Sequence, residues 1–429
     1  MNILVLGGGG REHAMVKAIV ESPESDAVYV APGNGGTAQI AENVAVDQMD
    51  AEAVKKFCQE KNVELVAIGP EAPLVAGVAD VLRDAGILVF GPGSEGAQLE
   101  GSKNFSKELM IEAGIPTAAY GTFFNCDDAL AYLDSHPAPI VVKADGLAAG
   151  KGVTVAMTDD EARNAVRECF GGRFGDAGST VVIEECMFGP ECSMLAFTDG
   201  ITVKEMATAQ DHKRALEGDK GPNTGGMGVY SPVPIVTDEE HATMVDILNR
   251  TIAKLRERGI DYRGVLYGGF MLTKDGPKVL EFNARFGDPE TQVLLPRLKT
   301  DLVKVMVACA KKELSNIELE WDPQWAVSVV LASKGYPGSY EKGFVISGIE
   351  DAEKLDGVTV YHAGTKIDDE GRVLTNGGRV LNVTALGPSF EEARDQAYRA
   401  CELINWDGMT YRKDIGARAL RGRSAWDEQ

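Results

Sequence analysis

The first hundred residues alternate between short apolar runs and stretches in which apolar residues recur at helical spacing. The apolar runs, predicted as buried strands, are Ile3–Leu6, Val28–Ala31, Leu65–Ile68 and Leu88–Phe90. The stretches between them, predicted as helices, are Glu12–Glu21, Ala51–Lys61 and Ala76–Ala85. Strands that alternate with helices in this way form a parallel sheet covered by helices. Such a sheet binds its ligands at the carboxyl ends of its strands.

The pattern changes after residue 101. A helix is predicted at Gly101–Gly114, because a glycine and then a proline end its periodicity. Four further strands and one helix are predicted at Ile140–Ala144, Val153–Ala156, Val181–Glu184, Cys192–Phe197 and Asp159–Cys169. The polar, glycine-rich stretch Ala209–Pro234 has little periodicity, so we expect a long loop that is either functional or disordered. A helix at Thr237–Gly259 and a strand pair at Val265–Leu272 and Lys278–Asn283 follow.

A third pattern begins near residue 324. Its predicted strands and helix are Ala326–Ala332, Gly357–Ala363, Arg379–Leu386 and Phe390–Ile404. We therefore expect an α/β and α+β multidomain protein. It would consist of a Rossmann-like N-terminal domain at residues 1–101, a central domain at 102–323 and a small α+β domain at 324–429. A chain of 429 residues is long enough for two to four domains.

The composition of the chain excludes several classes of ligand and partner. The formal net charge is −22, from 65 acidic and 43 basic residues, which argues against nucleic acid as a ligand. A small anionic ligand is still possible, because local loops bind it. Seven cysteines without a C-x-x-C pair indicate reduced thiols and no zinc site. The sequence shows neither a membrane-spanning run nor a signal-peptide pattern, so we expect a soluble cytoplasmic protein without a membrane partner.

The first predicted strand runs directly into four glycines, Gly7–Gly10. A dinucleotide fingerprint needs G-x-G-x-x-G and an acid about twenty residues further on. Here Glu12 and His13 stand where the third glycine would be, and the second strand ends in Ala-Pro-Gly without an acid. The glycines would still let a phosphate approach the N-terminus of the following helix. The alternative is a tight turn that serves packing alone.

A second glycine-rich segment reads Lys143-ADGLAAGKGV. It departs from the P-loop pattern, because three residues rather than four separate Gly146 from Gly150, and Gly152 replaces the hydroxyl residue. The β-branched residues that follow predict a hairpin between strands. With Lys143 and Lys151 at its ends, it could fold over a triphosphate; otherwise it is merely a flexible hairpin.

Two weaker motifs follow. The segment VVIEECMFGPECS passes from a strand through a turn, and its Glu191 could hold ribose hydroxyls. Acids beside a turn are, alternatively, ordinary surface residues. The loop AQDHKRALEGDKGPNTGGMG could order around a polar anionic substrate, or it could be a solvated surface loop.

The strongest motif is Lys278-VLEFNAR, at the end of the last predicted strand of the central domain. Residues two apart on a strand share a face, so Glu281, Asn283 and Arg285 project together. A carboxylate and an amide oxygen suit Mg²⁺ or Mn²⁺ held jointly with substrate phosphates. The guanidinium could stabilise charge on a phosphoryl group during transfer. The alternative is an edge strand with one solvated face.

The order of these motifs resembles the ATP-grasp superfamily and, within it, the glycinamide ribonucleotide synthetase (phosphoribosylamine–glycine ligase) family. The stretches that carry the resemblance are VLGGGGREHA, APGNGGT, GPEAPL, SKNFSKELM, KADGLAAGKGV, AQDHKRALEGDKGPNTGGMG, VLEFNARFGDPETQ and YRKDIGARAL. They extend over essentially the whole chain. The resemblance implies an ATP-grasp central domain with a mobile lid subdomain at about 120–190. We expect a monomer.

The resemblance also implies site residues. ATP contacts are Lys103, Lys143, Gly146, Gly150, Lys151, Gly152, Glu184, Glu185 and Glu191. Substrate contacts are Gly9, Gly10, Arg11, Gly33, Asn34, Gly35, Gly36, Pro70, Glu71, Asp211, Lys213, Arg214, Asn223, Thr224, Gly225, Gly226 and Met227. Arg285, Lys143 and Lys151 would act in catalysis, and Glu281 and Asn283 would hold Mg²⁺ or Mn²⁺. Gly269 stands where many superfamily members place another acidic metal ligand.

The implied reaction is the ATP-dependent joining of glycine to 5-phosphoribosylamine through glycyl phosphate. Three alternative functions share some of these sequence features. Another ATP-grasp ligase or carboxylase of purine metabolism would share the ATP machinery, but the PGNGGT and NTGGMG loops favour the glycine-using enzyme. An NAD(P)-binding oxidoreductase conflicts with the failed fingerprint. A nucleotide sensor would have no need of a transfer arginine.

Overall fold

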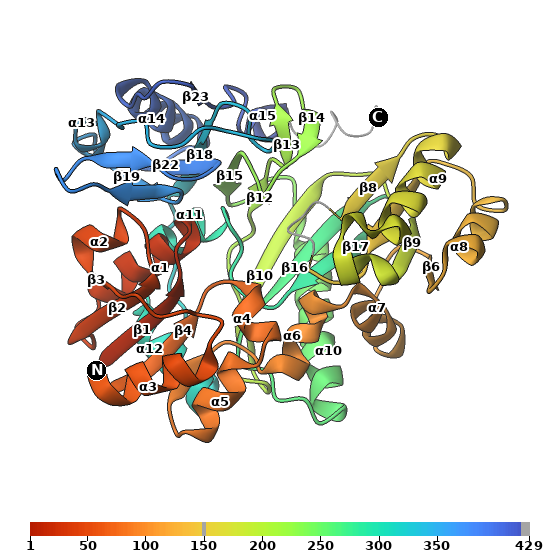
Figure 1. Cartoon of the computed structure of the whole chain (residues 1–429), viewed down its shortest axis with the longest axis horizontal. Helices are drawn as coiled ribbons and strands as arrows, with labels where there is room; N and C mark the ends of the chain where they lie inside the picture. Colours follow the sequence, from red (N-terminus) through yellow and green to blue (C-terminus); the bar gives the residue numbers. More distant parts are fainter. Residues whose placement is uncertain (148–151, 422–429) are drawn as a thin grey trace.

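The computed structural model describes residues 1–147 and 152–421 (Figure 1). The N-terminal domain contains a parallel sheet of order β3-β2-β1-β4-β5. Its strands are β1 (Asn2–Gly7), β2 (Ala27–Pro32), β3 (Glu42–Asn43), β4 (Val63–Ile68) and β5 (Leu88–Phe90). Its helices are α1 (Gly10–Val20), α2 (Thr37–Ile40), α3 (Ala51–Lys61), α4 (Glu71–Val75), α5 (Val78–Asp84) and α6 (Ser94–Gly101). The predicted parallel sheet with its helices is confirmed.

The lid subdomain, defined here as residues 120–185, has an antiparallel sheet of order β6-β9-β7-β8. Its elements are β6 (Tyr120–Phe123), α8 (Cys126–Leu133), β7 (Ile140–Ala144), β8 (Val153–Ala156), α9 (Asp159–Glu168) and β9 (Val181–Glu185). Short helical turns at Cys169–Arg173 and Gly175–Ser179 connect α9 to β9. Helix α7 (Lys103–Glu112) leads from the N-terminal domain into the lid. The lid encloses a hydrophobic core of its own.

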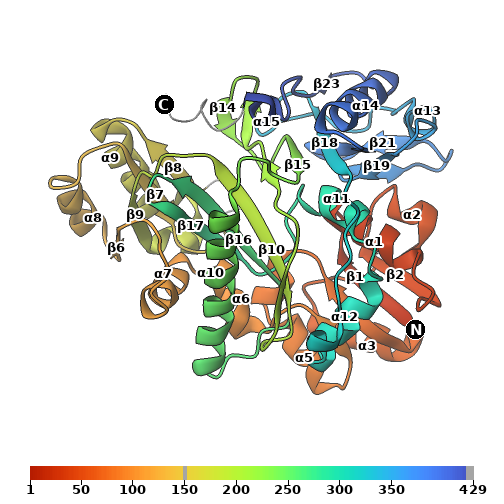
Figure 2. The ribbon, with the colours of Figure 1, turned by 180° about the vertical axis from the view of Figure 1, so that it is seen from behind.

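The central sheet is antiparallel, with order β11-β10-β16-β17. Its strands are β10 (Glu191–Thr198), β11 (Val203–Glu205), β16 (Gly264–Thr273) and β17 (Gly276–Asn283). The long helix α10 (Asp238–Glu257) packs against this sheet and is prominent from behind (Figure 2). Helices α11 (Thr291–Leu294) and α12 (Leu302–Lys311) and short turns at Leu295–Arg297 and Leu314–Asn316 follow β17. In the described residues no helix is long and apolar enough to span a membrane.

The stretch predicted as one long loop, 209–234, contains four short strands. They are β12 (Gln210–Asp211), β13 (Arg214–Leu216), β14 (Lys220–Asn223) and β15 (Gly228–Ser231). β13 and β14 form a hairpin, whereas β15 pairs with β18, about a hundred positions further along the chain. Strands this short cannot display a two-residue period, which is why the polar sequence predicts only a loop. The segment is thus tied into the next domain.

The C-terminal domain contains a mainly antiparallel sheet of order β12-β15-β18-β22-β19, with β23 beside β18. Its own strands are β18 (Trp325–Ser333), β19 (Val358–His362), β20 (Thr365–Ile367), β21 (Val373–Thr375), β22 (Arg379–Gly387) and β23 (Met409–Thr410). Its helices are α13 (Ile349–Glu353), α14 (Phe390–Leu403) and α15 (Ala417–Arg421). Helix α14 packs on this sheet, while α1 and α11 also contact it. The predicted α+β domain is confirmed.

Candidate active site

The carboxylate–amide pair predicted to bind metal lies on one face of the central sheet. Glu281 and Asn283 are two residues apart on β17, and Gly269 of β16 pairs with Glu281. Within the described residues the Asn283 side chain has no hydrogen-bond partner, and no group of three His, Cys, Asp or Glu residues could hold a metal. Oxygen donors of this kind fit Mg²⁺ when substrate phosphates complete its coordination.

A lysine of this chain lies against that carboxylate. The Nζ atom of Lys213 is 3.7 Å from Oε1 of Glu281 and 3.5 Å from Oε2 of Glu191. Burial alone would raise the pKa of the Glu281 carboxyl, but Lys213, Lys143 and Lys103 together lower it below its usual value. Glu281 is therefore held as a carboxylate among cations, as a metal ligand must be.

Two lysines share one buried glutamate at the base of the lid. Glu184 is 3% exposed, and its oxygens lie 2.8 Å from Nζ of Lys143 and 3.3 Å from Nζ of Lys107. Lys143 also donates a hydrogen bond to the carbonyl of Leu280, on β17. Burial lowers the pKa of Lys107 to about 8, with Glu184 opposing the shift. In this structure Glu184 orients Lys143, and its contact with the nucleotide stays a prediction.

Lys107 was not predicted from the sequence. It stands one helical turn after Lys103, and that spacing was the available signal. Lys103 lies at the start of α7 and donates through Nζ to the carbonyl of Gly146, 3.0 Å away. Gly146 has φ of +105°, a conformation that favours glycine. Asp145 accepts from the backbone N–H groups of Lys103 and Asn104.

The remaining predicted ATP contacts are distributed around this region. Glu185 accepts from the backbone N–H of Ala119 at 3.2 Å and lies 3.8 Å from Nζ of Lys278. The carbonyl of Gly152 accepts from the N–H of Ala144. Gly150 and Lys151 lie outside the described residues.

Arg285 is held by two carboxylates of the N-terminal domain. Its Nε atom donates to Glu71 at 3.2 Å, and its Nη2 atom lies 2.6 Å from Oε1 of Glu100. Glu100 also accepts from the backbone N–H of Ala284 at 2.8 Å. Glu71, predicted as a substrate contact, is thus a partner of Arg285. Glu100 was missed, because nothing in the sequence links it to a residue 185 positions away.

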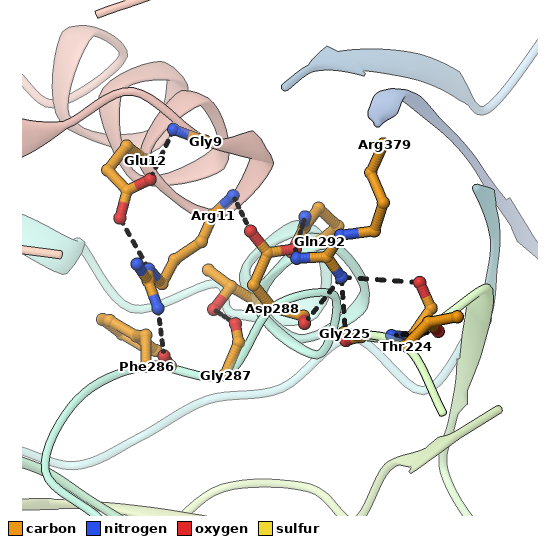
Figure 3. Close-up of polar contacts among 12 residues, drawn as sticks. Gly9, Arg11, Glu12, Thr224, Gly225, Phe286, Gly287, Asp288, Gln292 and Arg379 are labelled. Carbon is orange, nitrogen blue, oxygen red and sulfur yellow. Dashed lines mark hydrogen bonds and ion pairs between the residues drawn. The ribbon is translucent and has the colours of Figure 1, made fainter. Parts of the chain in front are cut away.

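The glycine-rich N-terminus of α1 already contacts two carboxylates (Figure 3). The Gly9 N–H donates to Oε2 of Glu12 at 2.7 Å, and the Arg11 N–H donates to Oδ2 of Asp288 at 3.4 Å. The Arg11 guanidinium binds Glu12 and the carbonyl of Phe286, and the side chain is 7% exposed. The backbone of this turn therefore presents donors to anions, whereas the Arg11 side chain is used in packing.

A C-terminal arginine completes the same cluster (Figure 3). Arg379 of β22 donates to the carbonyls of Gly225 at 2.8 Å and Asp288 at 3.0 Å. Its Nη2 atom is also 3.4 Å from Oδ1 of Asp288. Gln292 donates to that same oxygen at 2.9 Å. Three domains thus meet here. Arg379 was not predicted from the sequence, where its only signal is that it directly follows two glycines.

The PGNGGT loop (residues 32–37) of the N-terminal domain forms hydrogen bonds with the C-terminal domain. Asn34 donates through Nδ2 to the carbonyls of Gly8 at 3.0 Å and His362 at 2.8 Å. Its Oδ1 atom accepts from the backbone N–H of Gly36. Gly35 donates to the carbonyl of Thr365. Gly33 has φ of +73°, a conformation that favours glycine. Pro70 lies between β4 and α4, directly before the helix begins.

The predicted substrate loop is only partly directed at the site. Met227 is 3% exposed and packs in the hydrophobic core, so its side chain is not a free contact. Arg214 pairs with Asn223 across the β13–β14 hairpin and donates to a carbonyl within it. Thr224 donates to the carbonyl of Lys213. Burial and neighbouring carboxylates raise the pKa of Asp211 to about 8, against the opposing charge of Lys213.

A carboxylate and an amide on β17, a guanidinium directly after that strand, and lysines of the lid and α7 near the carboxylate are the features of an ATP-grasp enzyme. Models of the phosphoribosylglycinamide synthetase N domain, ATP-grasp (A) domain and C domain match residues 1–100, 101–291 and 326–418. The chain therefore belongs to the phosphoribosylglycinamide synthetase family, as its motifs predict.

Known relatives are similar over their whole length. The phosphoribosylamine–glycine ligase of Pseudomonas aeruginosa is 54% identical, and the match covers 99% of this chain and 100% of that protein. The crystal structure of the phosphoribosylamine–glycine ligase from Thermotoga maritima has a TM-score of 0.83 at 33% identity, covering 96% of this chain and 100% of that one. The biotin carboxylase domain of Hydrogenobacter thermophilus 2-oxoglutarate carboxylase, with a TM-score of 0.74 at 18% identity, shares the fold.

Proposed function

We propose that this chain joins glycine to 5-phosphoribosylamine at the expense of ATP, giving glycinamide ribonucleotide, ADP and phosphate in purine biosynthesis. The observation that supports this function best is the sequence identity with phosphoribosylamine–glycine ligases, which is 54% and 51% for two of them over nearly the whole chain. The biotin carboxylase domain shares the fold at low identity, so it gives no support to a carboxylase. The failed dinucleotide fingerprint leaves an oxidoreductase without support.

The chemistry proceeds in two steps. The glycine carboxylate attacks the γ-phosphorus of ATP, forming glycyl phosphate and releasing ADP. The amine of phosphoribosylamine then attacks the acyl carbon, and phosphate leaves as the amide forms and the amine loses a proton. Such steps need positioning and charge neutralisation more than covalent help from the protein.

The chain's cations supply that neutralisation. Lys103, Lys143 and Lys151 would contact the ATP phosphates. Glu184 fixes the direction of Lys143, whose Nζ atom is 2.8 Å from Oε2 of Glu184. Arg285, held by Glu71 and Glu100, would face the phosphoryl group during transfer. Because two carboxylates already orient it, its guanidinium would require little rearrangement.

Glu281 and Asn283 would hold Mg²⁺ or Mn²⁺ together with phosphate oxygens. The ion would neutralise charge that builds up on the transferring phosphoryl group. Lys213 would then turn from Glu281 toward Glu191, its other carboxylate partner. Gly269 offers no further oxygen, so water or phosphate would complete the coordination.

The acceptor's phosphate would bind at the N-terminus of α1, where Gly9, Gly10 and the Arg11 backbone present N–H groups. Asp288 now lies at that N-terminus and is held by Arg379. We infer that the phosphate takes its place and gains the Arg379 guanidinium. The PGNGGT loop and the Thr224–Gly226 turn would enclose the ribose.

We also propose the domain bounds 1–101, 102–323 and 324–429, with a lid that closes over ATP. Lid closure would protect the acyl phosphate from water. We expect a cytoplasmic monomer, for which light scattering of the purified chain is the direct measurement.

Substrate omission tests the function. ADP release is measured with ATP, Mg²⁺, glycine and freshly generated phosphoribosylamine, and each component is left out in turn. We expect ADP release to require glycine, and hydroxylamine to trap glycyl hydroxamate during turnover. Full ADP release without glycine and phosphoribosylamine would overturn the ligase function.

A further inference from the structure

The lid is joined to the rest of the chain by two segments. Residues 113–119 lead from α7 into β6, and residues 186–190 lead from β9 into β10. The two connections meet where the lid begins, because the backbone N–H of Glu185 donates to the carbonyl of Ala119 at 2.9 Å. A group that contacts the entering segment and the end of β9 together can therefore set the position of the lid.

Lys107 contacts both connections from a buried position on α7, outside the lid. The residue is 2% exposed. Its Nζ atom donates to Oγ1 of Thr117 at 2.7 Å and to the carbonyl of Ala118 at 3.4 Å, in the entering segment. The same atom is 3.3 Å from Oε1 of Glu184, near the end of β9. An ammonium group has three N–H donors, so Lys107 can hold these three oxygen atoms at once.

Glu184 transmits the position of Lys107 to Lys143. Its Oε2 atom lies 2.8 Å from Nζ of Lys143, whereas its Oε1 atom has no hydrogen-bond donor within the described residues. The ion pair with Lys107 is therefore what holds Oε1 in place. Without Lys107, both carboxylate oxygens would turn to Lys143, because a buried charge is costly unless a cation pairs with it. Lys143 would then be less available to a bound anion.

Both branches of this network end on β17, the strand of the predicted metal ligands. Oγ1 of Thr117 donates to the carbonyl of Val279 at 2.7 Å. Nζ of Lys143 donates to the carbonyl of Leu280 at 3.3 Å. These two carbonyls directly precede Glu281 along the chain. The contacts of Lys107 thus connect the lysine of the lid to the strand that would hold the metal.

We propose that Lys107 is a positioning residue for ATP, which holds Glu184 so that Nζ of Lys143 remains available to the phosphates. The assignment rests on the ligase function proposed above and on Lys143 as a phosphate contact. Lys107 itself touches no substrate in this account. Its effect on ATP therefore passes through Glu184.

The protonation of Lys107 gives this role a pH dependence. Burial lowers the pKa of Lys107 to about 8, while Glu184 and Glu185 oppose the shift and Lys143 adds to it. The ring of Tyr120 faces the ammonium group at 5.3 Å, and burial raises the pKa of that phenol, so it stays neutral near pH 8. Above about pH 8 the neutral amine no longer pairs with Glu184. The kcat/KM for ATP should then fall.

The first test compares Lys107→Met with Lys274→Met, the same replacement at an exposed lysine in the turn between β16 and β17. Initial rates of ADP release are measured at pH 7 while ATP, glycine and freshly generated phosphoribosylamine are varied in turn. Lys107→Met should raise the KM for ATP about tenfold through the misplaced Lys143, while the other two KM values change less than about twofold. Lys274→Met should match the parent chain.

The pH profile separates positioning from a general loss of structure. The ratio of kcat/KM for ATP, parent chain over Lys107→Met, should fall from about ten at pH 7 to about one at pH 9.5, because the parent then loses its ammonium group. A ratio that stays constant with pH would overturn the proposal. An equal rise in the KM for glycine and for ATP would do the same.

A double-mutant cycle with Glu184→Gln tests the route of the effect. Lys107→Met should change the kcat/KM for ATP less than about twofold when Glu184 is already neutral, because the two residues act as one unit. The double variant leaves no unpaired buried carboxylate, so it remains measurable where Lys107→Met alone fails to fold. An undiminished effect in the Glu184→Gln background would contradict the proposal. Glycine-dependent ADP release by the parent chain would still support the ligase function in every such case.

Discussion

The lid subdomain and the junction between the N-terminal and C-terminal domains are built in opposite ways. The lid has its own core, which includes Val142, Val166 and Ile183 and shares no residue with the two clusters that fill the rest of the described chain. At the junction, buried polar groups bond across the domains. Asn34 donates to the carbonyl of His362, and Nδ1 of His13 accepts from the His362 N–H at 2.7 Å.

From this difference we expect the lid, rather than the junction, to change its position. A subdomain with a separate core can change its position without exposing apolar surface, whereas the junction cannot open without breaking buried hydrogen bonds. The lid carries Lys143, and the frame carries Glu281 and the α1 N-terminus. On the proposed function, a movable ATP-binding lid would close on a rigid site for the acceptor and the metal.

The largest expected effect comes from the frame. Glu281→Gln keeps the size of the side chain but removes the charge that would hold the metal. We expect glycine-dependent ADP release to fall by about a hundredfold or more. The matched control is Asp275→Asn, a change to an exposed acid in the turn between β16 and β17. The affinity for ATP and the thermal midpoint of Glu281→Gln should stay close to those of this control. Near-normal turnover would contradict the division of roles between frame and lid.

Matched core truncations compare the two regions directly. Ile183 in the lid and Ile3 in the frame are both fully buried. Replacement of either by alanine should cost about 2–5 kcal/mol. Hydrogen exchange should then accelerate only in the lid for Ile183→Ala, and throughout the N-terminal domain for Ile3→Ala. Equal acceleration in both regions would mean that the lid is not an independent unit.

The junction should respond to acid. Burial, with a contribution from His362, lowers the pKa of His13 to about 3. The unfolded chain takes up this proton below about pH 6.5 and the folded chain does not, so stability falls as the pH decreases from 6.5. At pH 5 the loss from this group is about 2 kcal/mol. Denaturant titrations at pH 7 and pH 5 should show that His13→Asn loses less stability than the parent.

The matched control for that experiment is the exposed His136 of the lid. His136→Asn should follow the parent chain at both pH values. An identical pH response in His13→Asn and the parent would show that the junction does not depend on a neutral His13.

The smallest effect is expected where lid and frame meet at the surface. Glu185 and Lys278 lie 3.8 Å apart with partly exposed side chains. A double-mutant cycle with alanine at both positions should give a coupling of less than about 1 kcal/mol. A much larger coupling would mean that this contact, rather than the buried Lys107–Glu184 pair, holds the lid to the frame.

Much of the fold is readable from local signals. Helix Ala51–Lys61 is predicted to the residue, because Asp50 caps its start and Asn62, with φ of 52°, ends it. The strands of the parallel sheet are apolar because both faces are covered. The four short strands between 210 and 231 are not readable, since they are too short to show a period. β13 and β14 pair only with each other, and β12 is held by β15, whose other partner, β18, comes from the C-terminal domain.

The site divides in the same way. Arg285 lies beyond the end of β17, where its guanidinium binds Glu71 and Glu100, so the predicted strand face does not extend to it. Glu281 and Asn283 follow from a two-residue period on that strand. Glu100 and Arg379 do not, because each acts on residues that only the tertiary fold brings near. Arg11 shows the converse case. It lies in a recognisable motif, but its guanidinium donates a hydrogen bond to the backbone carbonyl of Phe286.

The central claim is that this frame activates glycine by phosphoryl transfer. The most direct measurement uses glycine with both carboxylate oxygens replaced by ¹⁸O, together with ATP, Mg²⁺ and freshly generated phosphoribosylamine. Mass spectrometry of the released phosphate should find one ¹⁸O atom for each amide formed. The carboxylate oxygen that bridges carbon and phosphorus in glycyl phosphate leaves with the phosphate, whereas the carbonyl oxygen stays in the amide. Phosphate without the label would contradict the account.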